Sequence, residues 1–298
     1  MQRNENSRRP RRRRSTFTTL VRRLPAVLVL GAVVAGDARA QHSHGPGSGH
    51  AHGPNLHVSS RWKECSFQLD AALTQRAWRQ FTGEAGVVAY FRPLIDAAPM
   101  GKGRWEVSAL QWKTGIDDAD AAWNDTFVHP DSAHWLFEGS GLQFPGLTAR
   151  VGVSDRTDVG VYFTKSPRAN YGFYGVQVQQ NMLGHAGGAW AASARASVVS
   201  LFGPEDVDFQ VFGADLVASR RIGLVSNRVA LSPYASVSAS LSRSHEKSSV
   251  VDLEDERVFG AQASVGAVMQ VAGIRLAVET TAARVPNVSL KVGFGRGL

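Results

Sequence analysis

The chain has 298 residues, with 33 basic and 25 acidic side chains and a net charge of +8. The positive charge is confined to one end, because residues 1–40 hold ten arginines and two acids, which leaves 23 basic and 23 acidic side chains in the remainder. Because residues 41–298 have no net charge, they lack the basic excess typical of proteins that bind nucleic acid, and nucleic acid is not expected as a partner. Cys65 is the only cysteine, which excludes an intramolecular disulfide.

The first forty residues have the three parts of a secretory signal peptide. Arginines crowd the first 23 positions, Leu24–Ala35 is a short apolar stretch, and Ala38-Arg39-Ala40 has the small-x-small form of a cleavage site. We therefore place the mature N-terminus at Gln41. Arg13-Arg14 leaves a twin-arginine route as the less favoured alternative to general secretion.

Residues 41–60 are rich in glycine and histidine and show no periodicity. This composition predicts a solvated, disordered arm. Capture of zinc or copper ions is the second interpretation, because imidazoles suit both metals. The histidines concerned are His42, His44, His50, His52 and His57.

Residues 61–100 are expected to form a helical and irregular segment before the main domain. Ser66–Phe81 carries apolar side chains at helical spacing. Gly83 and Gly86 are expected to end this helix, with a short β-like patch at Val87–Phe91 after them. The helix could plug a lumen, lie on the periplasmic face or contact a partner.

Residues 101–298 alternate between apolar and polar side chains, which is the period of a β-strand with two different faces. Leu231–Leu241 is the clearest example, and its length is close to the roughly 9–11 residues that a tilted strand needs to cross a bilayer. The expected strands are Gly103–Thr114, Gly139–Val153, Val159–Lys165, Tyr171–Met182, Ala189–Leu201, Val207–Ser219, Val229–Ser242, Arg257–Val271, Ile274–Thr281 and Val288–Gly295.

The fold class that these strands predict is all-β, a transmembrane antiparallel up-and-down β-barrel of about ten strands, with eight or twelve as the alternatives. The mature chain has no apolar run of the roughly 18 residues that a spanning helix requires. With an even strand count both termini are periplasmic. The two longest connections, 115–138 and 243–256, then both face outward, as outer loops do in such barrels.

Alternation alone does not say which strand face points inward. A soluble lipocalin-like barrel buries its apolar face, whereas a membrane barrel turns that face to lipid. Small Ala and Val side chains on the apolar face, and charges in mid-strand on the polar face, favour the membrane. The charges expected to line the lumen and bind ligand are Arg150, Arg195, Arg275, Glu279, Lys291 and Glu106.

These lumen charges are expected to form a network, because an unpaired charge in a narrow lumen is costly. We expect Glu279 and Glu106 to pair with Lys291 and Arg275. The excess of cations among the six would bias any passage toward anions. The alternation is compatible with an open lumen and with a plugged one.

Three segments carry a resemblance: the hairpin Leu147–Val161, Trp123–Phe137 and Phe202–Asp208. They resemble Gram-negative outer-membrane β-barrel proteins and, more narrowly, an uncharacterised family of such barrels, over roughly residues 60–298. The resemblance implies an outer-membrane barrel without a defined activity, so it brings no site residues. Such barrels usually end on an aromatic residue, whereas Phe294 is followed by four more residues, which puts the register of the last strand in question.

Sequence motifs of enzymes are missing. The chain has no Gly-x-Ser-x-Gly elbow, no His-Glu-x-x-His and no phosphate-binding loop. Ser244-His245 is the only serine–histidine pair that we identify as a candidate for lipid hydrolysis. The favoured interpretation is that His245 is an exposed loop residue without a catalytic role. No cofactor and no defined metal site are expected.

The expected outer connections have two further features. They are rich in acids, which could bind divalent cations, although solvated loop charge is the favoured interpretation. These acids are Asp117, Asp118, Asp120, Asp125, Glu205, Asp206, Asp208, Asp252, Glu254, Asp255 and Glu256. The first loop is aromatic, which is typical of a constriction or binding loop and equally of a membrane girdle; the residues are Trp123, His129, His134, Trp135 and Phe137.

The leading functional hypothesis is a non-enzymatic outer-membrane barrel that serves as a narrow pore, a small-ligand passage or a structural and adhesive protein. An outer-membrane lipid-modifying enzyme and a soluble periplasmic binding barrel are the alternatives. Partners that follow from the leading hypothesis are the lipid bilayer with its lipopolysaccharide, the barrel-assembly machinery and divalent cations at the acidic loops.

Overall fold

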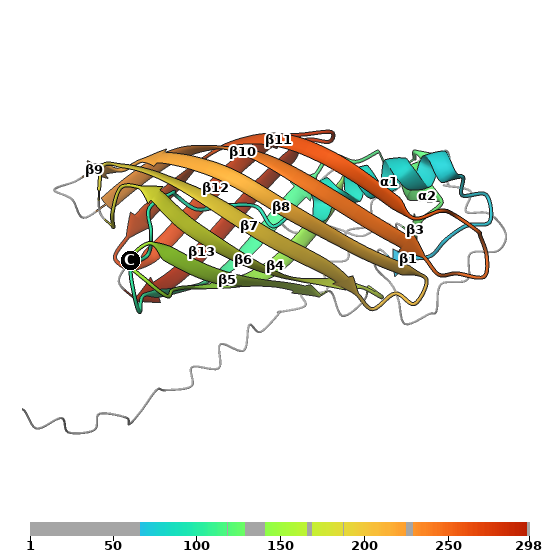
Figure 1. The fold of residues 1–298 in the computed structure, drawn as a ribbon, viewed down its shortest axis with the longest axis horizontal. Coiled ribbons are helices and arrows are strands. Elements are labelled where there is room, and N and C mark those ends of the chain that lie inside the picture. The colour runs from blue at the N-terminus through green and yellow to red at the C-terminus, as the bar shows by residue number, and fades with distance from the viewer. Residues whose placement is uncertain are drawn as a thin grey trace, which may run out of the picture. The chain divides into compact units, whose positions relative to one another are not determined.

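Ten antiparallel strands close into a barrel in the computed structural model, which describes residues 66–117, 119–128, 141–165, 169–186, 188–224 and 229–296 (Figure 1). The strands are β2 (Trp105–Thr114), β4 (Leu142–Gly152), β5 (Thr157–Lys165), β6 (Gly172–Leu183), β7 (Trp190–Phe202), β8 (Val207–Arg220), β10 (Val229–Glu246), β11 (Glu256–Val271), β12 (Ile274–Ala282) and β13 (Asn287–Arg296). These are the ten strands that the alternation predicts. The expected signal peptide and histidine-rich arm lie outside the described residues.

Hydrogen bonding runs from each barrel strand to the next, and β13 pairs with β2 to close the sheet. A short strand, β9 (Ile222–Leu224), extends the sheet beside the start of β10. The last strand stays in register to its end, with Gly295 opposite Glu106 and Arg296 opposite Trp105. Gly295 and Arg296, which follow Phe294, therefore do not disturb the closure of the barrel.

The two ends of the barrel differ in the length of their connections. At the turn end, β4 passes to β5 and β11 to β12 through short turns, and β2 begins where β13 finishes. At the loop end lie the long connections from β2 to β4 and from β10 to β11. The first of these contains α2 (Ala121–Asn124) and β3 (Phe127–Val128). The expectation that the two longest connections share one end is confirmed.

The strands turn their apolar face outward. Val237 and Val265 are 60% and 58% exposed, whereas Ser236 and Ser264 beside them are each 4% exposed. Exposed aromatic side chains gather near both ends, as the interfacial girdles of membrane barrels do. They are Trp105, Trp190 and Phe294 toward the turn end and Phe163, Tyr174 and Phe259 toward the loop end. The soluble barrel with a buried apolar face is therefore wrong.

Residues 66–103, which we call the internal segment, pass through the barrel from the loop end to the turn end (Figure 1). The segment begins with β1 (Ser66–Phe67), which pairs with β3, and continues as α1 (Gln75–Ala89), which packs against β10 and β11. It reaches the turn end where the Gly103 N–H donates to the Gly152 carbonyl at 2.8 Å. Ser66, the first described residue, therefore lies at the opposite end of the barrel from Arg296, the last described residue.

The helix of this segment lies nine residues later than its periodicity predicts. Thr74 caps it, with Oγ1 accepting from the Ala77 N–H at 3.3 Å, so Ser66–Phe67 is strand rather than helix. Gly86 lies inside α1 and does not end it. A Cβ on Gly86 would lie 1.8 Å from Ser242 Oγ of β10, so glycine is the residue that lets the helix approach the barrel wall.

The interior changes character along the barrel axis. Around α1 the loop-end half is packed with aromatic and aliphatic side chains, among which Trp78 and Phe81 have no exposed surface. On β8 the inward residues of this half are apolar, namely Val207, Phe209 and Val211. The polar face is therefore not the inward face everywhere, because a filled lumen needs an apolar lining where the amphipathic helix packs.

Candidate functional site

The turn-end half of the lumen gathers the charged side chains. All six lumen residues expected from the sequence lie there, each no more than 6% exposed: Arg150, Arg195, Arg275, Glu279, Lys291 and Glu106. They come from β2, β4, β7, β12 and β13 and point inward because alternate residues of a strand share one face. Their role in binding a ligand stays a prediction.

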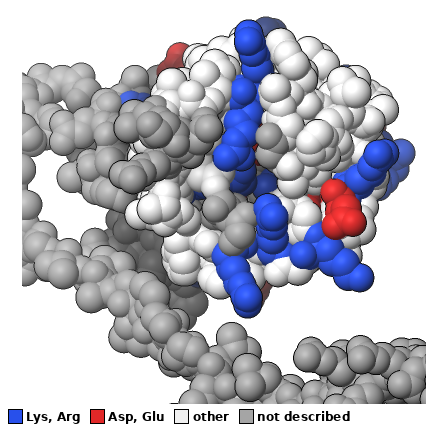
Figure 2. Space-filling model, turned by 90° about the vertical axis from the view of Figure 1, so that its left-hand side faces the viewer, with Lys and Arg blue, Asp and Glu red and all other residues white. Residues whose placement is uncertain are grey.

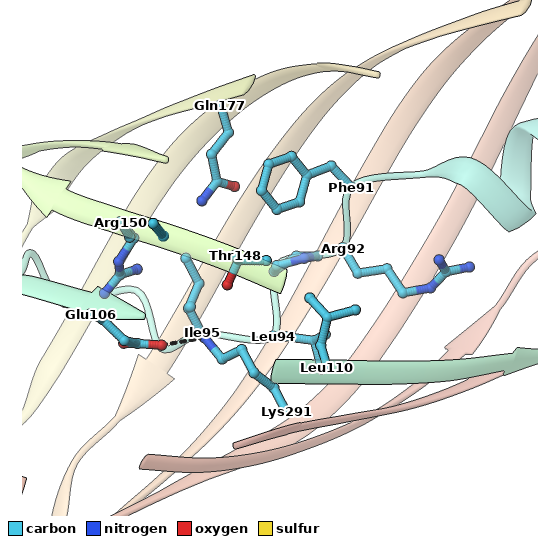
Figure 3. Close-up of a pocket in the computed structure, with 12 residues that line it drawn as sticks. Phe91, Arg92, Leu94, Ile95, Glu106, Leu110, Thr148, Arg150, Gln177 and Lys291 are labelled. Carbon is cyan, nitrogen blue, oxygen red and sulfur yellow. Dashed lines mark hydrogen bonds and ion pairs between the residues drawn. The ribbon is translucent and has the colours of Figure 1, made fainter. Parts of the chain in front are cut away.

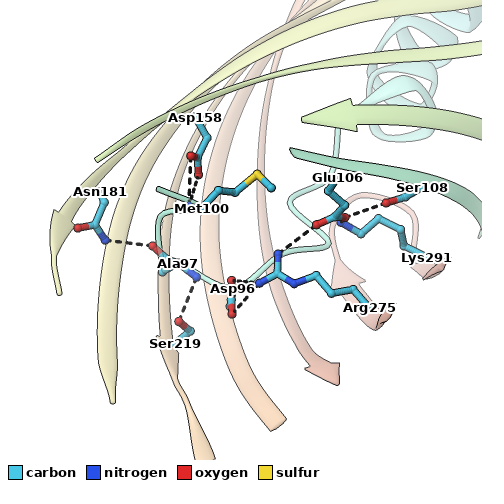
Figure 4. A network of polar contacts seen from close by, with 10 residues as sticks. All are labelled: Asp96, Ala97, Met100, Glu106, Ser108, Asp158, Asn181, Ser219, Arg275 and Lys291. Atoms are coloured by element: carbon cyan, nitrogen blue, oxygen red, sulfur yellow. Dashed lines mark hydrogen bonds and ion pairs between the residues drawn. The ribbon is translucent and has the colours of Figure 1, made fainter. Parts of the chain in front are cut away.

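One cluster centres on Glu106 (Figure 4). Its Oε1 accepts from Lys291 Nζ at 2.8 Å, and its Oε2 accepts from Arg275 at 3.1 Å. Arg275 also donates to Asp96 of the internal segment at 3.3 Å. The expected pairing of Glu106 with both cations is confirmed, because closure of the barrel sets β13 beside β2.

Glu279 makes no such pair among the described residues, so this part of the expected network is wrong. Its Oε2 accepts from the Tyr234 hydroxyl at 2.7 Å and from the Leu94 N–H at 3.2 Å. Glu279 and Arg275 lie on the same face of β12 but four residues apart, which is roughly 13 Å along a strand. The Leu94 N–H of the internal segment thus donates to Glu279, for which the sequence analysis expected a cation as partner.

A second cluster centres on Arg195, and its partner Asp215 was not foreseen. Arg195 Nε donates to Asp215 Oδ2 at 2.9 Å, and Arg195 Nη2 lies 2.8 Å from the same oxygen in the ion pair. It donates to Gln177 Oε1 at 2.5 Å and to the Phe91 carbonyl. Asp215 lies on the same face of β8 as the apolar residues Val207, Phe209 and Val211, so the alternation does not mark it as a lumen charge.

The same carboxylate ties the internal segment to the wall. Asp215 Oδ1 accepts from the Tyr90 hydroxyl at 2.8 Å and from Ser238 Oγ at 2.5 Å. Both oxygens of Asp215 are therefore occupied, and the ion pair with Arg195 is fully buried. A satisfied network of this kind rigidifies the groups that form it.

Wall side chains also satisfy the irregular backbone of the internal segment (Figure 4). The Ala97 N–H donates to Ser219 Oγ at 3.0 Å, and the Ala97 carbonyl accepts from Asn181 Nδ2 at 3.1 Å. The Met100 N–H donates to the Asp158 carboxylate at 3.1 Å. Non-helical backbone at membrane depth is tolerated only where protein or water satisfies its polar groups, and here the wall supplies them.

The charges in this half balance. The buried cations are Arg92, Arg150, Arg195, Arg275 and Lys291, and the buried anions are Asp96, Glu106, Asp158, Asp215 and Glu279. The cation excess that sequence reasoning expected is therefore not found among the described residues. The predicted bias of the lumen toward anions depended on that cation excess, so it is no longer supported.

A small cavity of about 20 Å³ lies between the internal segment and β4 (Figure 3). Arg150 lines it opposite Glu106, its cross-strand neighbour on β2. In the described part of the chain none of the three guanidinium nitrogens of Arg150 makes a hydrogen bond. A space of this size accommodates only one or two water molecules, so it is no path for a solute.

Ser244 and His245 do not form a catalytic pair. Ser244 faces the lumen, 3% exposed, and shares a hydrogen bond of 2.6 Å with the Thr82 hydroxyl of α1. His245 faces outward, with Nδ1 2.6 Å from Asp255 Oδ1. Neighbouring residues of one strand point to opposite sides, so their sequence adjacency keeps the two side chains apart.

The outer connections show neither a metal site nor an aromatic girdle in the residues that the structure describes. Their acids form no group of three or more potential metal ligands among those residues. Trp123 packs onto α1, and its Nε1 donates to Glu84 at 2.6 Å. His129, His134, Trp135 and Phe137 lie outside the described residues. No described helix is long and apolar enough to cross a membrane.

The turn end presents a basic rim to its surroundings (Figure 2). Its exposed cations outnumber the single exposed acid in the turns there, Asp155. These cations are Lys102, Arg104, Arg156, Arg220, Arg221 and Arg296. Basic side chains beside a bilayer attract anionic lipid headgroups.

A closed antiparallel barrel with an apolar, aromatic-edged outer surface and a polar lumen is a transmembrane β-barrel of the outer membrane. Solved structures that are similar to the chain are barrels too. The β domain of the Bordetella autotransporter Brka is 11% identical and matches over 65% of this chain and 98% of that chain, with a TM-score of 0.38.

Two further similar structures are the N-terminal β-barrel domain of Pseudomonas aeruginosa OprF and LpxR from Salmonella typhimurium. OprF is 11% identical over 65% of this chain and 98% of that chain, with a TM-score of 0.26. LpxR is 10% identical over 64% of this chain and 99% of that chain, with a TM-score of 0.32. No family model and no curated protein matches the sequence. At such identities the likeness concerns the fold alone.

Proposed function

We propose that this protein is a closed, non-enzymatic barrel with a structural and adhesive role, rather than a passage for solutes. One observation carries the proposal: the internal segment is hydrogen-bonded to the barrel wall along its whole course through the turn-end half of the lumen. Its contacts run from Tyr90, bound to Asp215, to Met100, bound to Asp158. A narrow pore or small-ligand passage would need a continuous path free of such bonds.

The loop end supports the same proposal. Phe67 of β1 lies edge-on to Phe81 of α1 and Phe127 of β3, with ring centroids 5.9 and 5.1 Å apart. Trp123 of α2 contacts Phe81 at 4.9 Å. These rings are buried, and their packing holds four elements in fixed positions at the loop end. We assign contact with other molecules to the rigid surface that this packing supports.

The partners proposed follow from the two ends of the barrel. The fold places the strands in contact with the bilayer. We assign the basic rim to anionic headgroups of the leaflet that it faces. The acidic loop end is assigned to lipopolysaccharide, with divalent cations bridging the two negative surfaces. Barrel-assembly machinery is the partner expected during insertion.

Planar-bilayer recording tests the closed state. The wild-type barrel is expected to give no steady conductance, because the internal segment fills the lumen. Replacing residues 91–98 by glycine and serine removes the side chains of Asp96 and its neighbours but keeps the wall, and is expected to produce openings. The same replacement in the outer connection 247–255 is the control and should stay closed. A wide, steady wild-type conductance contradicts the proposal.

A lipid-release assay tests the non-enzymatic role. Purified barrel in vesicles that contain lipopolysaccharide and phospholipid is expected to release no fatty acid, with or without calcium ions. Ser244→Ala should give the same result as the wild type, because the Ser244 hydroxyl bonds to Thr82 and is turned away from His245. Release by the wild type that Ser244→Ala abolishes would favour the lipid-modifying alternative.

A further inference from the structure

We infer that Arg150 and the cavity beside it form a binding site for one small monovalent anion, with chloride as the expected ion. The site lies in the turn-end half of the lumen, between β4 and the internal segment. The inference goes beyond the closed state proposed above and does not depend on it, because it concerns one position in the lumen and not a path across the membrane.

The first observation is a buried guanidinium without hydrogen bonds. Arg150 is 6% exposed, and none of its three guanidinium nitrogens makes a hydrogen bond in the described chain. The buried side chains of Arg92, Arg195 and Arg275, by contrast, all donate to carbonyl or carboxylate oxygens. A buried charge is costly unless an acceptor or an opposite charge meets it, so Arg150 calls for a partner that accepts hydrogen bonds.

The second observation is that donors surround the cavity. Arg150 and Lys291 both bring charged N–H groups to its lining. Gln177 points its amide group toward the same space (Figure 3). The oxygen of that amide accepts from Arg195 at 2.5 Å, which leaves its nitrogen as the group that the cavity can use. An acceptor placed beside Arg150 therefore meets donors from three strands of the wall.

The carboxylates near Arg150 are already engaged. Glu106 is the only acid among the described residues of the lining, and its two oxygens accept from Lys291 at 2.8 Å and from Arg275 at 3.1 Å. Asp158 of the neighbouring strand β5 lies outside the lining and accepts from the Met100 N–H at 3.1 Å. Neither carboxylate makes a hydrogen bond with Arg150, so the acceptor that this side chain lacks has to come from a bound species.

The size and chemistry of the cavity favour a halide. A water molecule brings two O–H donors of its own, which a lining rich in donors serves poorly. Chloride accepts hydrogen bonds from several donors and donates none. It is close to a water molecule in size, so a cavity of about 20 Å³ admits it, whereas sulfate and phosphate are too large.

The basic rim offsets the charge of a bound anion. Cations and anions balance in this half of the lumen, so a bound anion adds one negative charge to it. β4 ends at Gly152, two residues after Arg150, which places the site close to the turn end. The exposed cations there outnumber the single exposed acid, Asp155. Their positive potential stabilises an anion at Arg150 and raises the local concentration of anions.

The chloride dependence of unfolding tests the inference. Urea unfolding of the barrel in lipid vesicles is followed in sodium chloride and in sodium gluconate at equal ionic strength. At a concentration about ten times its dissociation constant, chloride is expected to raise the wild-type folding equilibrium constant roughly elevenfold over gluconate, because it binds only the folded state.

Two variants separate the site from a general effect of salt. Arg150→Met should lose the difference between chloride and gluconate. Arg79→Met is the control, because it removes an exposed cation at the loop end and keeps the site, so it should show the wild-type rise. Equal stability of the wild type in the two salts overturns the inference. A chloride effect that Arg150→Met retains overturns it as well.

Bromide in a crystal of the wild type gives a second test that does not require a variant to fold. Its anomalous scattering should reveal one ion within hydrogen-bonding distance of the Arg150 guanidinium. Bromide on the outer surface alone would be an adventitious ion only and would overturn the inference. A water molecule in place of bromide at Arg150 would do the same.

Discussion

Replacing Arg195 with methionine is expected to lower the free energy of unfolding by about 3–5 kcal/mol, the cost of breaking a buried ion pair. The change leaves Asp215 Oδ2 without its hydrogen-bond donor and its ion-pair partner, and the carbonyl of Phe91 without its donor. It also releases the internal segment at the point where Tyr90 shares the same carboxylate. Urea unfolding of the barrel in lipid vesicles, followed by tryptophan fluorescence, measures the loss.

Arg150→Met is the matched control for this prediction. Both arginines are buried in the same half of the lumen, but in the described chain the Arg150 guanidinium makes no hydrogen bond. Because Arg150 has no hydrogen bond to lose, and its removal spares the cost of burying a charge without such bonds, a change within about 1 kcal/mol is expected in a medium without chloride. The double variant Arg195→Met with Asp215→Leu should recover part of the loss. Equal losses at Arg150 and Arg195 would contradict the prediction.

Val237→Arg is expected to cost about 2–4 kcal/mol of unfolding free energy, because it places a charge on the lipid-facing side near the middle of the bilayer. Val237 lies in mid-strand on β10, opposite Ala263 of β11 and Leu216 of β8. Folding into lipid vesicles, read from the shift between unboiled and boiled protein on a gel, measures the cost.

Val250→Arg is the control, because Val250 has a similar exposed fraction, 53%, but lies in the outer connection from β10 to β11. Its expected cost is within about 0.5 kcal/mol, as for surface substitutions generally. Ser236→Arg would be a poor control. Ser236 faces a lumen that the internal segment fills, so an arginine there would overpack the interior. Equal tolerance of both valine substitutions would argue against a lipid-facing position of Val237.

The strands and their faces follow from the sequence alone. Two-residue alternation is a local property of the chain, since neighbouring side chains of a strand point to opposite sides whatever surrounds them. Leu231–Leu241 therefore reveals a strand with one apolar and one polar face, and Ser244 and His245 are separated by the same rule. An even count of strands then places the long connections together and sets Lys291 beside Glu106.

The contents of the lumen were decided only by the tertiary structure. The helical period of residues 66–81 shows an apolar face but not the surface that this face contacts. From the sequence, Gly86 therefore predicts the end of a helix, whereas in the fold it lets the helix approach Ser242 closely. Asp215 and Glu279 find their partners through the internal segment, across 125 and 185 residues of chain. Such contacts depend on closure of the barrel around a chain that passes through it. No local pattern encodes that closure, because the same alternation suits an open lumen and a filled one.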